Sequence, residues 1–141
     1  MTRKLTPGRK VRHPKEVAAQ LDNLEYYTDP DAHGATQYHY LTPFAKLVKL
    51  VATDRVKTMC DRLDCYWMMD LVAGLKQRLC DTFYVVYIVK NEDSSFYFMI
   101  DDGNDNILYC KRYPFTDIKK NLKMYLCPNK DLWVLMLPSE Y

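Results

Sequence analysis

The residues that could carry out chemistry in this 141-residue sequence are few, and the first set is acidic. If these carboxylates converge, they could hold a metal ion for phosphoryl chemistry. They come from four separate segments: Asp70, Asp102, Asp117 and Glu140. Asp102 begins the sequence Asp-Gly-Asn, which is typical of a tight hairpin turn. We therefore predict no metal site and no cofactor.

Nucleophilic candidates are equally isolated. Ser139 lies outside any G-x-S-x-G elbow, and Cys65 is a thiol near an expected helix start. His39 lies between Tyr38 and Tyr40 and could contact a base or a phosphate, although a partly buried histidine explains it equally well. The chain has no P-loop, no dinucleotide-binding glycine pattern and no zincin helix. We predict that the protein is not an enzyme.

Aromatic residues offer a binding surface instead of a catalytic one. They make up 13% of the chain, including twelve tyrosines, and they suit cores and interfaces alike. Trp67 and Asp70 are three residues apart and share a face if this segment is helical, where they could line a pocket or simply pack. The candidate binding residues are Tyr38, His39, Tyr40, Tyr66, Trp67, Asp70 and Asp117.

The net charge of +2 conceals a basic start. Residues 1–15 hold six basic and no acidic side chains, and the remainder holds 14 basic against 18 acidic ones. Such a segment could grip phosphates or could be a solvated tail. The basic residues are Arg3, Lys4, Arg9, Lys10, Arg12 and Lys15. We predict a flexible basic arm at 1–13 and a single domain at 14–141.

Cysteine usage and hydropathy indicate a compartment. Five cysteines, an odd number without a C-x-x-C pair, predict reduced thiols in a cytoplasmic protein that has no signal peptide. No apolar run reaches the roughly 18 residues that suggest a membrane span. We expect no contact with a membrane.

The elements that must position these residues change character along the chain. Helical spacing predicts helices at 14–25, from Thr42-Pro43 onward, and as a pair within 53–79, with Thr42 and Thr53 as candidate N-caps. After Cys80 the hydrophobic period falls to two, which predicts strands at 82–90, 95–101, 106–113, 121–127 and 132–137. The fold class is then α+β: N-terminal helices on one face of a five-stranded antiparallel meander sheet. Its open edges could pair in a homodimer.

Several short motifs occur in a fixed order: "YWMMD" (66–70), "DGN" (102–104), "FTD" (115–117) and "LPSEY" (137–141). On these motifs the chain resembles an uncharacterised family of small bacterial proteins encoded on phages and conjugative elements, over roughly residues 36–141. Tyr38 and His39 match more loosely. The chain departs from the family at Arg55, where a glycine is usual, and at Ile118-Lys119, where Phe-Pro is usual. The resemblance implies a fold and a genomic neighbourhood but no activity.

Three functions remain open. The first is a non-enzymatic module of a phage or mobile element that binds another protein, such as a bacterial defence complex that it inhibits. The second is a nucleic-acid-binding accessory protein, whose residues 1–15 grip the backbone while Tyr38 and Tyr40 stack on bases. The third is a protein that sequesters a small molecule or nucleotide signal in a pocket.

Overall fold

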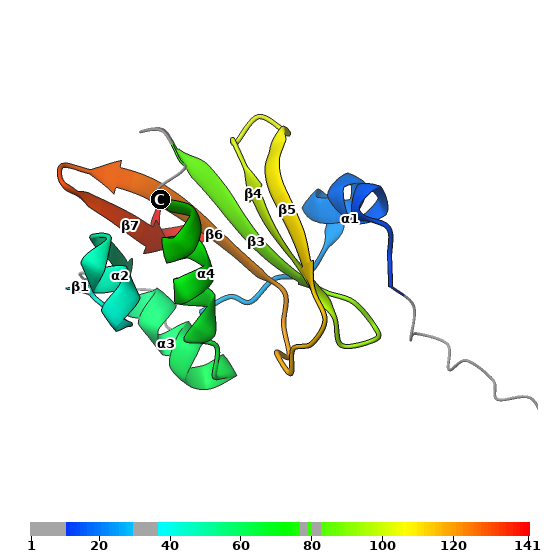
Figure 1. Cartoon of the computed structure of the whole chain (residues 1–141), viewed down its shortest axis with the longest axis horizontal. Coiled ribbons are helices and arrows are strands. Elements are labelled where there is room, and N and C mark those ends of the chain that lie inside the picture. Colours follow the sequence, from blue (N-terminus) through cyan, green and yellow to red (C-terminus); the bar gives the residue numbers. More distant parts are fainter. Residues whose placement is uncertain (1–10, 30–36, 77–78, 80–82) are drawn as a thin grey trace, which may run out of the picture.

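The computed structural model describes residues 11–29, 37–76, 79 and 83–141. These residues form an α+β fold with four α-helices and one seven-stranded mixed sheet (Figure 1). The strand order across the sheet is β1-β2-β7-β6-β3-β4-β5. The strands are β1 (Tyr38–His39), β2 (Leu50–Thr53), β3 (Tyr84–Lys90), β4 (Phe96–Asp101), β5 (Ile107–Tyr113), β6 (Leu122–Asn129) and β7 (Leu132–Met136).

The predicted five-stranded antiparallel meander is wrong in two respects. Strands β1 and β2 extend the sheet, and β2 pairs with β7 in parallel. Strand β6 pairs with β3 instead of following β5, so only β3-β4-β5 is a true meander. Strand β2 could not be recognised from the sequence, because Leu50 and Val51 fit the end of a helix as well as a buried strand.

Helix boundaries follow local sequence chemistry. Helix α2 (Pro43–Leu47) begins at the predicted cap, where the Thr42 hydroxyl accepts a hydrogen bond from the Ala45 N–H. Helix α3 (Asp54–Leu63) begins in the same way after Thr53, whose hydroxyl accepts from the Val56 N–H. Asp64 adopts a left-handed conformation and ends α3, and α4 (Trp67–Lys76) follows at once.

The helices cover both faces of the sheet, not one as predicted. Helices α2, α3 and α4 lie together over one face, and α1 (Pro14–Gln20) lies apart, beside the β4–β5 end (Figure 1). A short 3₁₀ turn, η1 (Leu21–Asn23), replaces the end of the helix predicted at 14–25. Val17 and Leu21 pack against the second face, in a cluster with Tyr87 and Met99.

The two central strands hold the core. All residues of β4, and all of β3 except Lys90, are buried, because helices cover them from both sides. The main cluster joins α2, α3 and α4 to alternate residues of the strands, and the smaller cluster lies under α1. Within the described residues, no helix is long and apolar enough to cross a bilayer.

Candidate functional site

A groove runs between helix α4 and the outer strands β4 and β5. Its larger part is a hollow of about 390 Å³. Trp67 and Leu71, one turn apart on α4, form one side of it, and the segment after β5 forms the other. The complete lining is Trp67, Leu71, Phe96, Tyr113, Pro114, Phe115, Thr116 and Asp117.

Three aromatic rings form a fixed wall of this hollow. The ring centroids of Trp67 and Phe96 are 5.1 Å apart, and Phe96 stacks on Tyr113 at 5.0 Å with an interplanar angle of 11°. The Lys111 ammonium lies 5.1 Å from the Tyr113 centroid. Phe115 is 70% exposed, so its ring is available to a ligand while the wall behind it stays in place.

A second hollow of about 230 Å³ continues the groove along α4. It shares Leu71 and Tyr113 with the first and adds Asp70, whose carboxylate accepts a hydrogen bond of 2.7 Å from the Thr42 hydroxyl. We call the two hollows together the aromatic groove. Its outer wall includes Tyr109, from the same face of β5 as Tyr113.

Asp117 lies at one end of the aromatic groove on a loop that is anchored on both sides. The Thr116 N–H donates to the Ser94 carbonyl at 2.7 Å, and the Thr116 hydroxyl accepts from the Ile118 N–H at 3.1 Å. Thr116 and Ile118 are buried, so Asp117 is held exposed between them. Its carboxylate makes no hydrogen bond or ion pair with any described residue. Ile118 is therefore an anchor of this loop.

A polar hollow of about 680 Å³ adjoins the aromatic groove and shares Thr116 and Asp117 with it. Three basic residues line it: Arg12, Lys90 and Lys119. The Arg12 guanidinium donates to the Lys90 carbonyl at 2.6 Å and to the Asn91 side chain at 3.3 Å. Arg12 therefore bridges to the end of β3 and is not free to follow a ligand.

The structure brings three of the predicted binding residues, Trp67, Asp70 and Asp117, to the aromatic groove. Tyr66 has another role. Its phenol donates a hydrogen bond to the Asp61 carboxylate, which raises the pKa of Tyr66 to about 12 and lowers the pKa of Asp61. This bond fastens the junction of α3 and α4.

The predicted residues Tyr38, His39 and Tyr40 lie at the other edge of the sheet, on and just after β1. A ring nitrogen of His39 contacts the Asp54 carboxylate, and this hydrogen bond, with one from the Gln37 N–H, lowers the pKa of Asp54. None of the three lines the aromatic groove.

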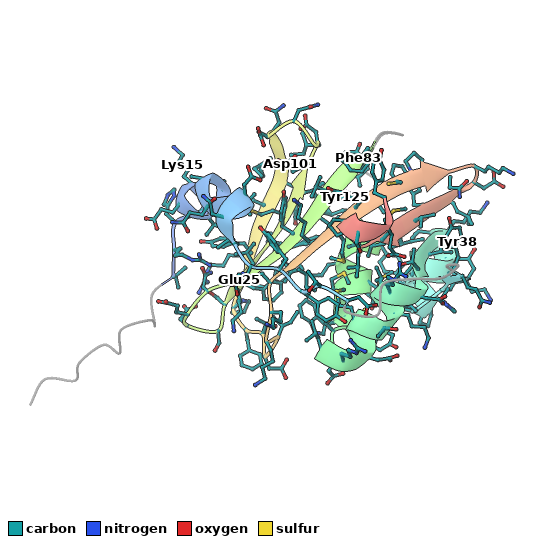
Figure 2. All side chains as sticks on the ribbon, turned by 180° about the vertical axis from the view of Figure 1, so that it is seen from behind. Lys15, Glu25, Tyr38, Phe83, Asp101 and Tyr125 are labelled. Carbon is teal, nitrogen blue, oxygen red and sulfur yellow. The ribbon has the colours of Figure 1, made fainter. Side chains whose placement is uncertain are left out.

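The structure describes only part of the basic arm. Arg3, Lys4, Arg9 and Lys10 lie outside the described residues. Lys15 is exposed on α1. Figure 2 shows Lys15 and Tyr38 at opposite ends of the molecule, so these two residues cannot share one short nucleic-acid contact.

Two of the four candidate carboxylates, Asp102 and Glu140, serve local structure in separate parts of the fold. Asp102 caps the β4–β5 hairpin, accepting from the Asn104 N–H at 2.7 Å. Glu140 accepts from the Thr53 hydroxyl at 2.7 Å and from the Leu137 N–H at 2.9 Å, far along the chain from both groove acids. Among the described residues, no three metal-binding side chains come together.

Sequence reasoning missed the aromatic residues that complete the groove, Phe96, Tyr109, Tyr113 and Phe115. The alternation of β5 puts Tyr109 and Tyr113 on one face, which was visible. Which face of β5 meets α4 depends on how β5 pairs with β4. That pairing shifts register between Ile100 and Asp101, and the shift cannot be predicted from the sequence.

Comparison with known proteins gives a family but no function. The profile of a family of unknown function, DUF6876, matches residues 30–141. No match was found among curated proteins or among solved structures.

Proposed function

Because this chain belongs to DUF6876, we propose its function from its own geometry: it is a non-enzymatic module that binds an extended segment of a partner protein. The segment pairs with strand β5 and places a large apolar side chain in the aromatic groove. The observation that supports this most is the position of an aromatic-lined hollow directly beside an edge strand.

Strand β5 supplies the backbone half of the site. It is the last strand in the sheet order, and among the described residues it pairs with β4 alone. A strand of seven residues with one open side can accept another chain as an added strand. Lys111 and Arg112 are charged side chains on this edge, a feature that also limits indiscriminate pairing.

The aromatic groove supplies the selective half. In strand addition, backbone hydrogen bonds give affinity and pockets for side chains give specificity. Trp67 and Tyr113 are partly exposed rings on a rigid wall, and Phe115 lies at the rim. Aromatic residues of this kind are enriched among residues that dominate binding energy.

The charge at the rim defines the partner further. Asp117 is exposed and has no partner among the described residues, and Asp70 lies at the second hollow. We therefore expect the bound segment to carry a basic residue next to its apolar anchor. In line with the family resemblance, we propose a bacterial host protein as the partner, with inhibition of a defence complex as one such role.

The test is selection from a displayed library of random peptides on the full chain, followed by mapping of amide chemical shifts. We expect enriched peptides with an aromatic or large aliphatic residue beside a basic one, and shifts concentrated in β5. Phe115→Ala should weaken their binding about tenfold or more. The matched control is Leu47→Ala, which removes a side chain of α2 that is 79% exposed and lines neither hollow of the groove.

Two results would contradict the proposal: no peptide enriched over the Phe115→Ala protein, or shifts that map away from β5. Sedimentation at the concentrations used must show a monomer, because a homodimer through β5 would occupy the same edge. That dimer would itself be lost on adding a charge to the edge.

A second candidate, binding of a small molecule, is favoured by the polar hollow next to the groove. Its basic residues Arg12, Lys90 and Lys119 together with the nearby rings would suit a nucleotide-like ligand. Native mass spectrometry of the protein purified from bacteria tests this, since a retained ligand adds a defined mass.

A further inference from the structure

We infer that the hollow between β1 and the β6–β7 turn is a binding site for single-stranded nucleic acid, with tyrosine rings stacking on bases and two lysines contacting phosphates. The hollow measures about 520 Å³ and is lined by Tyr40, Lys49, Asn129, Lys130, Asp131 and Leu132. It lies at the opposite edge of the sheet from β5, so it is separate from the peptide site proposed above.

Two exposed tyrosines provide the stacking surface. Tyr38 is 46% exposed and Tyr40 is 45% exposed. Residues two apart on extended backbone point to the same side, whereas His39 between them points to Asp54. The Tyr38 hydroxyl accepts from the Asn129 side chain at 3.4 Å, which ties this ring to the rim of the hollow. Successive bases stack on such ring pairs without a need for a particular sequence.

Two lysines face this hollow from turns that fix their backbones. Lys49 has a φ of 60° and Lys130 a φ of 56°, a left-handed conformation that is unusual for lysine. Lys49 is held because its N–H donates to the Lys46 carbonyl and its carbonyl accepts from the Trp133 N–H at 3.0 Å. The two turns thus place both lysines in the lining of the same hollow.

The lining of this hollow has more basic than acidic residues, whereas the chain beyond residue 15 carries an acidic excess. Lys49 and Lys130 are both exposed, and neither forms an ion pair with a described residue. Asp131 is the one acid in the lining, so the hollow retains a positive surplus. Free ammonium groups beside exposed rings match the alternation of phosphate and base in a single strand, which is why we choose this ligand over a protein segment.

The experiment is fluorescence anisotropy of the full chain with a labelled 12-nucleotide single strand, as RNA and as DNA of mixed sequence, over a salt series. We expect saturable binding that weakens as salt rises. Tyr40→Ala should weaken it about tenfold. The double variant Lys49→Gln/Lys130→Gln should lower the slope of log K against log salt by about 1.4, since each neutralised phosphate of a single strand contributes about 0.7.

Control variants distinguish binding at this site from binding by the basic arm, binding at the peptide site and nonspecific binding. Lys15→Gln, at the far end of the molecule, and Phe115→Ala, in the aromatic groove, should both bind the strand as the wild type does. Circular dichroism must show that each variant is folded. The variant Tyr40→Phe keeps the ring and should therefore retain binding.

Four results with the nucleic-acid probe would overturn the inference. They are absence of binding at 100 μM protein in low salt, unchanged affinity in folded Tyr40→Ala, an unchanged salt slope in the double lysine variant, and loss of binding in Lys15→Gln. Equal binding to vesicles containing phosphatidylserine would also overturn it, because a charged surface without bases would then suffice.

Discussion

The two edges of the sheet are held in different ways. Strand β5 has seven residues, a ladder with β4 that shifts register only between Ile100 and Asp101, and a wall of stacked rings. Strand β1 has two residues, and side chains secure its surroundings: His39 contacts Asp54, and Glu140 bonds to Thr53 at the end of β2. The β5 edge can therefore admit a ligand without losing its own support, whereas the β1 edge depends on a few polar contacts.

The largest loss of stability at the β1 edge is expected from Glu140→Ala. The Thr53 hydroxyl and the Leu137 N–H, both on buried residues, would each lose their acceptor. An unsatisfied buried donor costs about 1–3 kcal/mol, so we expect unfolding to become easier by about 3 kcal/mol in urea titration. Hydrogen exchange should quicken in β1 and β2 and stay unchanged in β5.

The control for this variant is Ser139→Ala, which changes the exposed neighbouring residue and should leave stability within about 0.5 kcal/mol of the wild type. Glu140→Gln keeps an acceptor oxygen and should fall between the two. A Glu140→Ala protein as stable as the wild type would show that the β1 edge does not depend on this carboxylate.

The matching change at the other edge is Tyr113→Ala. It removes the ring that stacks on Phe96 and part of the wall of the aromatic groove. We expect a loss of about 1–2 kcal/mol in thermal or urea unfolding, from the buried ring area and the stacking contact. Exchange of the β1 and β2 amides should not change.

Arg112→Ala is the control for the β5 edge, because Arg112 lies on the other face of the same strand and forms only a surface ion pair with Asp93 at 3.5 Å. Such a pair contributes little, so stability should hardly change. If Tyr113→Ala accelerated exchange in β1 as strongly as in β5, the two edges would be one cooperative unit.

The β5 edge could be predicted from the sequence better than the β1 edge. Alternation and the Asp-Gly-Asn turn gave the β4–β5 hairpin, and the threonine caps gave the starts of α2 and α3, because these signals are local. Strand β2 and the pairing of β6 with β3 could not be predicted. They depend on contacts between segments that are far apart in sequence.

In the candidate site, too, local features could be predicted from the sequence and long-range ones could not. The helical spacing of Trp67 and Asp70 predicted one shared helix, and both lie on α4, where each lines a hollow of the groove. Their role in binding stays a prediction. The partners across the groove depend on strand register, which no local pattern fixes. Tyr38 and Tyr40 are predicted binding residues like Trp67, but they lie at the β1 edge of the sheet and do not line the aromatic groove.

The smallest expected effect tests whether the β1 edge responds to pH. The hydrogen bond from His39 and then that from the Gln37 N–H hold the pKa of Asp54 below its ordinary value of 3.8. A carboxylate whose pKa is lowered by folding stabilises the protein above the unfolded pKa, and this contribution disappears as the pH falls through the folded pKa. The wild type should therefore exceed Asp54→Asn in urea stability at about pH 5. The difference should begin to shrink as the pH falls to 3.8 and should vanish only below the lower pKa of folded Asp54. Asp131→Asn, an exposed residue outside this contact, should keep the wild-type profile. A difference between wild type and Asp54→Asn that persists unchanged into acid would mean that the contact acts through packing and not through charge.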